Sequence, residues 1–243
     1  MKKTGAFCRL GAGLLAFSLL FFLAGELMRL PLPAAAPTAG GAEEVVFVLD
    51  AGHGGEDGGA VGVDGAAEKV LNLAIVRMLG EMLEGAGQRV VYTRTDDRLL
   101  YTPEQDIRGQ RKMYDLRNRL QIAEGQRGAV LVSIHMNQFP APQCSGLQVY
   151  YGTGAAESRL LAEKIQATVR ADLQPGNHRA VKAAGENIYL LHRATVPAVL
   201  VECGFLSNPV ECQKLSRQDY QRRLSFSVFC AMMEYIEENG GDT

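Results

Sequence analysis

Short apolar runs and longer amphipathic stretches alternate along the chain. The runs are typical of buried strands, because strands covered on both faces carry few polar side chains. We expect strands at residues 45–49, 89–93, 129–135, 146–151 and 198–202. Between most of them, apolar residues recur at three- and four-residue steps, which predicts amphipathic helices. These helices are expected at residues 68–84, 113–124, 158–173 and 220–237.

Specific residues mark the end of one expected helix and the start of another. Gly85 and Gly87 end the apolar periodicity of the first helix, and glycine commonly follows a helix C-terminus. After the last strand, Asn208 is suited to cap a helix, Pro209 to its first position and Glu211 to its third.

The alternation of strands and helices predicts an α/β fold, with a largely parallel sheet covered by helices on both faces. In such folds, ligands bind beyond the carboxyl ends of the strands. The chain has 243 residues and shows no internal repeat. We therefore expect a single folded domain at residues 43–238, followed by a short tail at 239–243.

The first 42 residues read as a targeting segment. Basic residues precede an apolar run at 10–25, and a Pro/Ala/Gly-rich stretch follows at 31–42. This order predicts an export signal or an uncleaved membrane anchor, with the folded domain outside the cytoplasm. Small residues at 34–36 offer a cleavage site, but Pro37 directly after them disfavours cleavage. We favour the anchor, and cleavage stays open.

Composition and charge exclude several classes of protein. Hydrophobic residues make up 47% of the chain, which excludes a disordered protein. There are 25 Lys and Arg against 27 Asp and Glu, and no basic block follows the N-terminus, so nucleic acid is not an expected partner. The five cysteines form no C-x-x-C pair, which argues against a cysteine-based zinc or redox site. Any metal must be held mainly by His and carboxylate.

Three side chains with metal chemistry follow or end expected strands. They are His53, His135 and Glu202. Because the carboxyl ends of parallel strands share one edge of the sheet, all three should point into one crevice. A glutamate directly after Ala-Val-Leu-Val costs several kcal/mol to bury alone, so Glu202 needs a partner, either a bound cation or an arginine. On position alone, a His near a strand end is more often a hydrogen-bonded structural residue than a ligand.

The loop at residues 54–65 is rich in glycine, which permits tight turns and close approach to a ligand. It contains neither G-x-x-x-x-G-K-[ST] nor a G-x-G-x-x-G that opens a helix, so a nucleotide site is not expected. The chain also lacks the H-E-x-x-H zinc motif. Residue patterns alone therefore predict a His/His/carboxylate site and leave the reaction open.

Four separated motifs make this prediction more specific, because together they resemble those of a known protein family. They are LDAGHGG at 49–55, EK at 68–69, SIHMN at 133–137 and VECGFLSNP at 201–209. In these motifs, and in their order from about Val45 to Ile236, the chain resembles the zinc-dependent N-acetylmuramoyl-L-alanine amidases of the amidase-3 family. Ala51 departs from the family, which usually has Pro there, and so does Cys203, where a small apolar residue is usual. We expect Cys203 to be a small buried hydrophobe, the alternative being a site of oxidation.

The resemblance implies one Zn²⁺ ion, held by His53, Glu68 and His135, with Glu202 as the catalytic carboxylate. Two imidazoles and one carboxylate leave a tetrahedral zinc with an open position. Glu202 would take a proton from the water that attacks the lactyl carbonyl of muramic acid, and pass it to the nitrogen of L-alanine. The substrate implied is peptidoglycan, and a partner protein for zinc loading or activity stays open.

Within the family, the segments at 111–119 and 145–152 are most similar to the germination-specific, spore-cortex type. That likeness implies removal of stem peptides before muramic-δ-lactam forms, and a location between the two forespore membranes.

Four further residues have expected supporting roles. Asp50 is expected either to accept a hydrogen bond from His53 or to cap the turn after its strand. Arg94 and Arg119 are candidates to bind substrate carboxylates, unless they form structural ion pairs. Asn137, in the SIHMN motif, is a further candidate for contact with a ligand or the substrate.

Two rival functions remain at this point. One is a zinc peptidase that cuts within the stem peptide. The other is a catalytically silent, wall-binding regulator, although such a protein would be expected to lose a ligand or the catalytic glutamate.

Overall fold

The structure is a computed structural model that describes residues 44–240. The expected signal or anchor at 1–42 lies outside the described residues, as do the last three residues of the expected tail. The final helix continues through Gly240, so the tail begins later than expected. Among residues 44–240, no helix is long and apolar enough to span a membrane.

The described residues form one six-stranded sheet in the order β2-β1-β3-β6-β4-β5. Strands β2, β1, β3 and β6 run parallel, β4 is antiparallel to β6, and β5 is parallel to β4. The expected largely parallel sheet is therefore confirmed. The strands are β1 (Val46–Ala51), β2 (Arg89–Tyr92), β3 (Ala129–Asn137), β4 (Gln148–Tyr151), β5 (Lys182–Ala183) and β6 (Ala198–Phe205).

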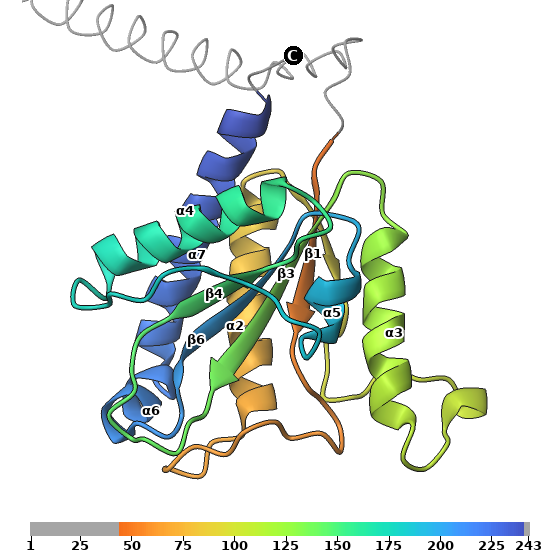
Figure 1. Ribbon diagram of the computed structural model, residues 1–243, viewed down its shortest axis with the longest axis horizontal. Helices are drawn as coiled ribbons and strands as arrows, with labels where there is room; N and C mark the ends of the chain where they lie inside the picture. Colours follow the sequence, from red (N-terminus) through yellow and green to blue (C-terminus); the bar gives the residue numbers. More distant parts are fainter. Residues whose placement is uncertain (1–43, 241–243) are drawn as a thin grey trace, which may run out of the picture. The chain divides into compact units, whose positions relative to one another are not determined.

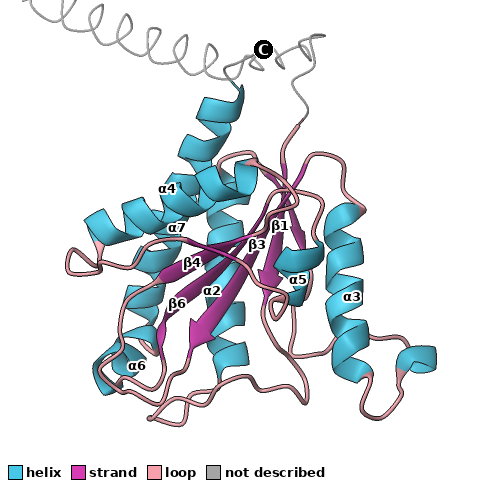
Figure 2. Ribbon diagram, in the orientation of Figure 1, coloured by secondary structure: helices cyan, strands magenta, loops and turns pink. Residues whose placement is uncertain are grey.

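Helices cover both faces of this sheet, as expected (Figures 1 and 2). On one face lie α2 (Glu68–Gly85), α4 (Glu157–Asp172), α6 (Pro209–Leu215) and α7 (Gln218–Gly240). On the other face lie α3 (Arg111–Glu124) and α5 (Tyr189–Arg193). The Asn208 side chain accepts hydrogen bonds from the backbone N–H groups of Val210 and Glu211, which confirms the expected cap of α6.

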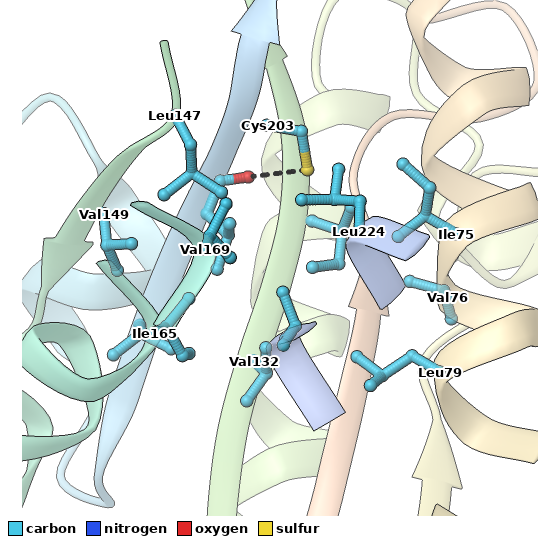
Figure 3. Close-up of a cluster of buried hydrophobic side chains, with 14 of the residues drawn as sticks. Ile75, Val76, Leu79, Val132, Leu147, Val149, Ile165, Val169, Cys203 and Leu224 are labelled. Carbon is cyan, nitrogen blue, oxygen red and sulfur yellow. Dashed lines mark hydrogen bonds between the residues drawn. The ribbon is translucent and has the colours of Figure 1, made fainter. Parts of the chain in front are cut away.

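The larger core cluster lies between β1, β3 and β6 and the helices α2, α4 and α7. Figure 3 shows Val132 of β3 facing Leu79 of α2 in this cluster. Cys203 of β6 packs here too, 1% exposed, with Sγ 3.7 Å from the carbonyl oxygen of Val201. Burial raises the pKa of the Cys203 thiol. Cys203 is therefore a small buried hydrophobe, as expected.

The order of the strands places a crevice beside β1. The chain passes from β1 through α2 to β2 at one edge of the sheet, then through α3 to β3 on the other side of β1. This reversal leaves a gap between the connections that follow β1 and β3, where ligands bind in open α/β sheets. His53 follows β1, and His135 lies near the end of β3.

Candidate metal centre

His53 has an uncommon backbone conformation directly after β1. Its φ is 63°, in the left-handed region that non-glycine residues seldom adopt. Two contacts hold it there. Its Nδ1 lies 2.9 Å from Oδ2 of Asp57, and its carbonyl oxygen accepts a 2.7 Å hydrogen bond from Arg119. The turn thereby aims the Nε2 edge of the ring at Glu68, 3.2 Å away.

Glu68 is the first residue of α2, and it is 3% exposed. Its two carboxylate oxygens accept backbone hydrogen bonds, Oε2 from Ala60 at 2.7 Å and Oε1 from Met136 at 3.0 Å. Burial on its own raises the pKa of Glu68, but hydrogen bonds from His135 and His53 hold it well below its usual range. The carboxylate is thus charged and fixed in place before any ligand binds.

His135 completes a tight cluster of three side chains. Its Nδ1 lies 3.0 Å from Oε1 of Glu68, and its ring centroid lies 5.0 Å from that of His53. The space for this ring comes from Gly52, because a Cβ at that position would lie 2.2 Å from the His135 ring.

The cluster has the dimensions of a metal site. Ligand atoms of His53, Glu68 and His135 all lie within 4.8 Å of one another. Ligand atoms around a tetrahedral zinc with bonds of 2.0–2.1 Å are about 3.3 Å apart, close to the 3.0 and 3.2 Å found here. Two imidazoles and one carboxylate also form a donor set that zinc accepts. The three residues therefore fit a zinc ion.

Glu202 lies on β6 beside this cluster, in register with His135 on β3. It lines a cavity of about 270 Å³ together with both histidines. Its Oε2 atom is buried and has no hydrogen-bond partner among the described residues. Burial raises the pKa of Glu202 to about 7. Among the described residues no arginine donates to this atom, which favours the other partner expected from the sequence, a cation with its water.

Asp50 does not contact His53, which corrects one expectation. Its carboxylate is fully buried and accepts hydrogen bonds from Thr93, Ser133 and Arg119 at 2.5–2.6 Å. Burial raises the pKa of Asp50, yet the Arg119 guanidinium and the two hydroxyls bring it down to about 2. The side chain points into the sheet toward these donors because Asp50 is still within β1. The acceptor for His53 is Asp57 instead.

Arg94 and Arg119 lie in buried hydrogen-bond networks, which favours structural roles for both. Both are 1% exposed. Arg119 donates to Asp50, Asp115 and the carbonyl oxygens of Ala51 and His53. Arg94 donates only to backbone carbonyl oxygens, including that of Gly52. Each nitrogen of both guanidinium groups donates at least one hydrogen bond within the protein, which favours structural roles over contact with the substrate.

Asn137 ends β3 where its pairing with β6 shifts register. Its carbonyl oxygen accepts a 2.8 Å hydrogen bond from Leu206, which holds the two strand ends together. Contact of its side chain with a ligand stays a prediction.

Two residues of the site escaped the sequence reasoning. Asp57 is the acceptor for His53, and Asn72 donates to Glu68 and to the carbonyl oxygen of Gly52. A signal existed for Asn72, because it lies four residues after Glu68 and thus on the same helix face. For Asp57, the signal is a carboxylate in the glycine-rich loop after His53, although Glu56 and Asp64 in the same loop share that signal.

Known proteins are similar to this chain in sequence and in fold. A germination-specific N-acetylmuramoyl-L-alanine amidase of Bacillus subtilis is 34% identical over 80% of this chain and 81% of its own length. The CwlD amidase of Clostridioides difficile, solved in complex with the GerS lipoprotein, is 36% identical with a TM-score of 0.76, covering 80% of this chain and 100% of that one. The amidase AmiC2 of Nostoc punctiforme is 28% identical with a TM-score of 0.68, covering 81% and 99%.

The profile of one protein family, described as N-acetylmuramoyl-L-alanine amidase, matches residues 47–233. This range contains β6, all of β1 except Val46, and every residue of the cluster described above. The chain therefore belongs to the N-acetylmuramoyl-L-alanine amidase family, Amidase_3.

Proposed function

We propose that this protein is a zinc-dependent hydrolase that cleaves the amide bond between the lactyl group of N-acetylmuramic acid and L-alanine in peptidoglycan. One observation carries the proposal. The Oε2 atom of Glu202 is buried without a hydrogen-bond partner among the described residues, and Glu202 shares a cavity with the two histidines of a His/Glu/His cluster of metal-site dimensions. A buried polar atom without a partner is costly, and such a cost is typical of functional sites.

His53, Glu68 and His135 would hold the metal. When bound there, Zn²⁺ supplies Lewis acidity, which polarises the scissile carbonyl and lowers the pKa of water. The remaining tasks belong to the chain itself. Asp57 orients His53, and the backbone N–H groups of Ala60 and Met136 orient Glu68.

Glu202 moves the proton. Its free Oε2 atom accepts the proton of the attacking water and then delivers it to the departing nitrogen of L-alanine. A pKa raised by burial suits both steps, because a group that titrates near neutral pH can serve as base and then as acid.

The amidase reaction is tested by product analysis. The purified protein is incubated with peptidoglycan, with Zn²⁺ or with a chelator, and Glu202→Gln serves as control. We expect stem peptides with a free L-alanine amine, released only with metal and only by the unsubstituted protein. Fragments cut within the stem peptide would instead identify a peptidase. Retained zinc without any release would favour a silent wall-binding protein.

We further propose that the substrate is spore-cortex peptidoglycan and that the protein acts outside the cytoplasm, between the forespore membranes. The support is the similarity to the germination-specific amidase of B. subtilis. Spores of a strain that lacks the gene should contain no muramic-δ-lactam, which muropeptide analysis would detect. A normal lactam content would contradict the cortex role.

A partner protein is proposed on similar grounds. The solved amidase of C. difficile is in complex with a lipoprotein, so we expect this chain to bind an exported lipoprotein of its own organism. Affinity purification of the tagged full-length protein from sporulating cells tests this. Full activity of the isolated protein together with the absence of any co-purifying lipoprotein would contradict it.

A further inference from the structure

The cavity at the metal cluster contains a single cationic side chain that is free to bind a ligand. Among the residues that line it, only Lys112 and Arg119 carry a fixed positive charge. Arg119 is buried, and its Nε, Nη1 and Nη2 atoms all donate to protein acceptors. Four of its five N–H donors are used in this way and the residue is 1% exposed, so Lys112 is the more accessible cation for binding an anion.

Lys112 lies in the first turn of α3, and its side chain is 63% exposed. Its Nζ atom lies 3.1 Å from Oδ2 of Asp57, the one acceptor that the described residues offer it. An ammonium group has three donors, so two remain for a ligand. Leu116 and Ile188 line the same cavity.

The position of this ammonium matches one feature of the substrate. Asp57 connects Lys112 to His53. Its Oδ2 atom contacts both Nζ of Lys112 and Nδ1 of His53, and the His53 ring separates that Nδ1 from Nε2. Roughly two residues of extended peptide cover such a span, at about 3.3–3.6 Å each. A group on the stem-peptide residue after L-alanine is therefore within reach of Lys112 when the scissile amide lies at the metal cluster and the peptide runs from there toward α3.

We propose that Lys112 binds the free carboxylate of the stem-peptide residue that follows L-alanine, and so selects peptides in which this residue is D-glutamate rather than its α-amide. This inference rests on the proposed amidase function and names a specificity determinant for it. Asp57 holds the ammonium at the cavity wall between turnovers. Binding of the peptide adds a second carboxylate to the same ammonium.

The test compares two soluble muramoyl peptides that differ in one group, a free α-carboxylate or an α-amide on the second residue. Lys112→Met should lower kcat/KM for the carboxylate substrate by roughly 10- to 100-fold, the range for a hydrogen bond to a charged group, mostly through KM. The amide substrate should be cleaved as before. Lys112→Arg should restore most of the preference. Lys214→Met, which removes a lysine from a different cavity, is the matched control.

Zinc content and melting temperature are measured for every variant, because Lys112 also contacts Asp57. An equal loss on both substrates, or a loss of zinc, would show that Lys112 acts only through Asp57 and would overturn the inference. If the unsubstituted protein cleaves neither peptide, the proposed amidase function fails, and binding of the two peptides to the zinc-loaded protein decides the inference. Equal affinities would overturn it, and tighter binding of the carboxylate peptide that Lys112→Met abolishes would support it.

Discussion

Glu202 on β6 and His135 on β3 are direct register partners at the centre of the sheet, yet the Oε2 atom of Glu202 receives no hydrogen bond from the described residues. The sheet thus places the Glu202 side chain beside a metal-site histidine, and no described residue donates a hydrogen bond to its Oε2 atom. Burial rather than a particular neighbour is the main cause of its raised pKa.

Glu202→Gln should abolish most of the activity and leave zinc binding intact. The substitution keeps the size of the side chain and removes the proton acceptor, and a positioned general base typically contributes about 10²- to 10⁴-fold. Rate measurements together with zinc analysis check this. A variant that loses its zinc would show that Glu202 is a ligand.

The same variant should change the pH dependence of stability in the metal-free protein. The pKa of Glu202 rises from 4.5 to about 7 on folding, so its contribution to stability is present below pH 4.5 and is lost as the pH rises through 7. At pH 8, Glu202→Gln should therefore be the more stable protein, by on the order of 3 kcal/mol. Near pH 4.5 the two should be equal. Urea unfolding at both values measures this, and equal stability at pH 8 would mean that the carboxylate has a partner.

Asp57→Ala should weaken zinc binding by roughly 10- to 100-fold, the usual cost of removing a carboxylate that orients a ligating histidine. Asp57→Asn, which retains an acceptor oxygen, should lose less. Competition with a chromophoric chelator measures the affinity. Glu56→Gln is the matched control, because Glu56 is adjacent, exposed and paired with Arg111 instead. Unchanged affinity in Asp57→Ala would remove Asp57 from the site.

Gly52→Ala should displace His135. A Cβ at this position would lie 2.2 Å from two atoms of the imidazole ring, so the ring or the backbone must move. We expect a loss of the rise in melting temperature that zinc causes in the unsubstituted protein, together with a destabilisation of about 1–3 kcal/mol. Gly58→Ala is the control, because nothing lies within 4 Å of a Cβ there. A normal zinc response in Gly52→Ala would contradict the geometry.

Asp50→Asn should alter the stability of the protein in acid. Asp50 has a pKa of about 2 in the folded protein against a reference value of 3.8, so its contribution is present above pH 4 and is lost as the pH falls toward 2. The shift corresponds to on the order of 2 kcal/mol. Unfolding titrations should show that stability falls less steeply in acid for Asp50→Asn, and as steeply as in the unsubstituted protein for Asp106→Asn, at an exposed ion pair. Equally steep falls for the first variant and the unsubstituted protein would contradict the prediction.

Much of the fold follows from local pattern. The period of apolar residues predicts α2 and α4 within one or two residues, because each helix buries one face along its whole length. Elements of two to five residues, such as η1 (Pro103–Gln105), β5 and α5, are too short for a period to show. The antiparallel direction of β4 is not visible either, since apolar content does not encode strand direction.

The sequence by itself determined the chemistry available at the strand ends, because the residue types and their family motifs are local properties of the chain. Only the tertiary structure decided which of these side chains keep atoms available to bind a metal ion or the substrate. His135 meets Glu68 across 67 positions of sequence, and Arg119 meets Asp50 across 69. The order of the strands brings such groups together, and burial then determines which charges are neutralised. For that reason the two arginines became structural, while Glu202 and Lys112 kept free atoms facing the cavity.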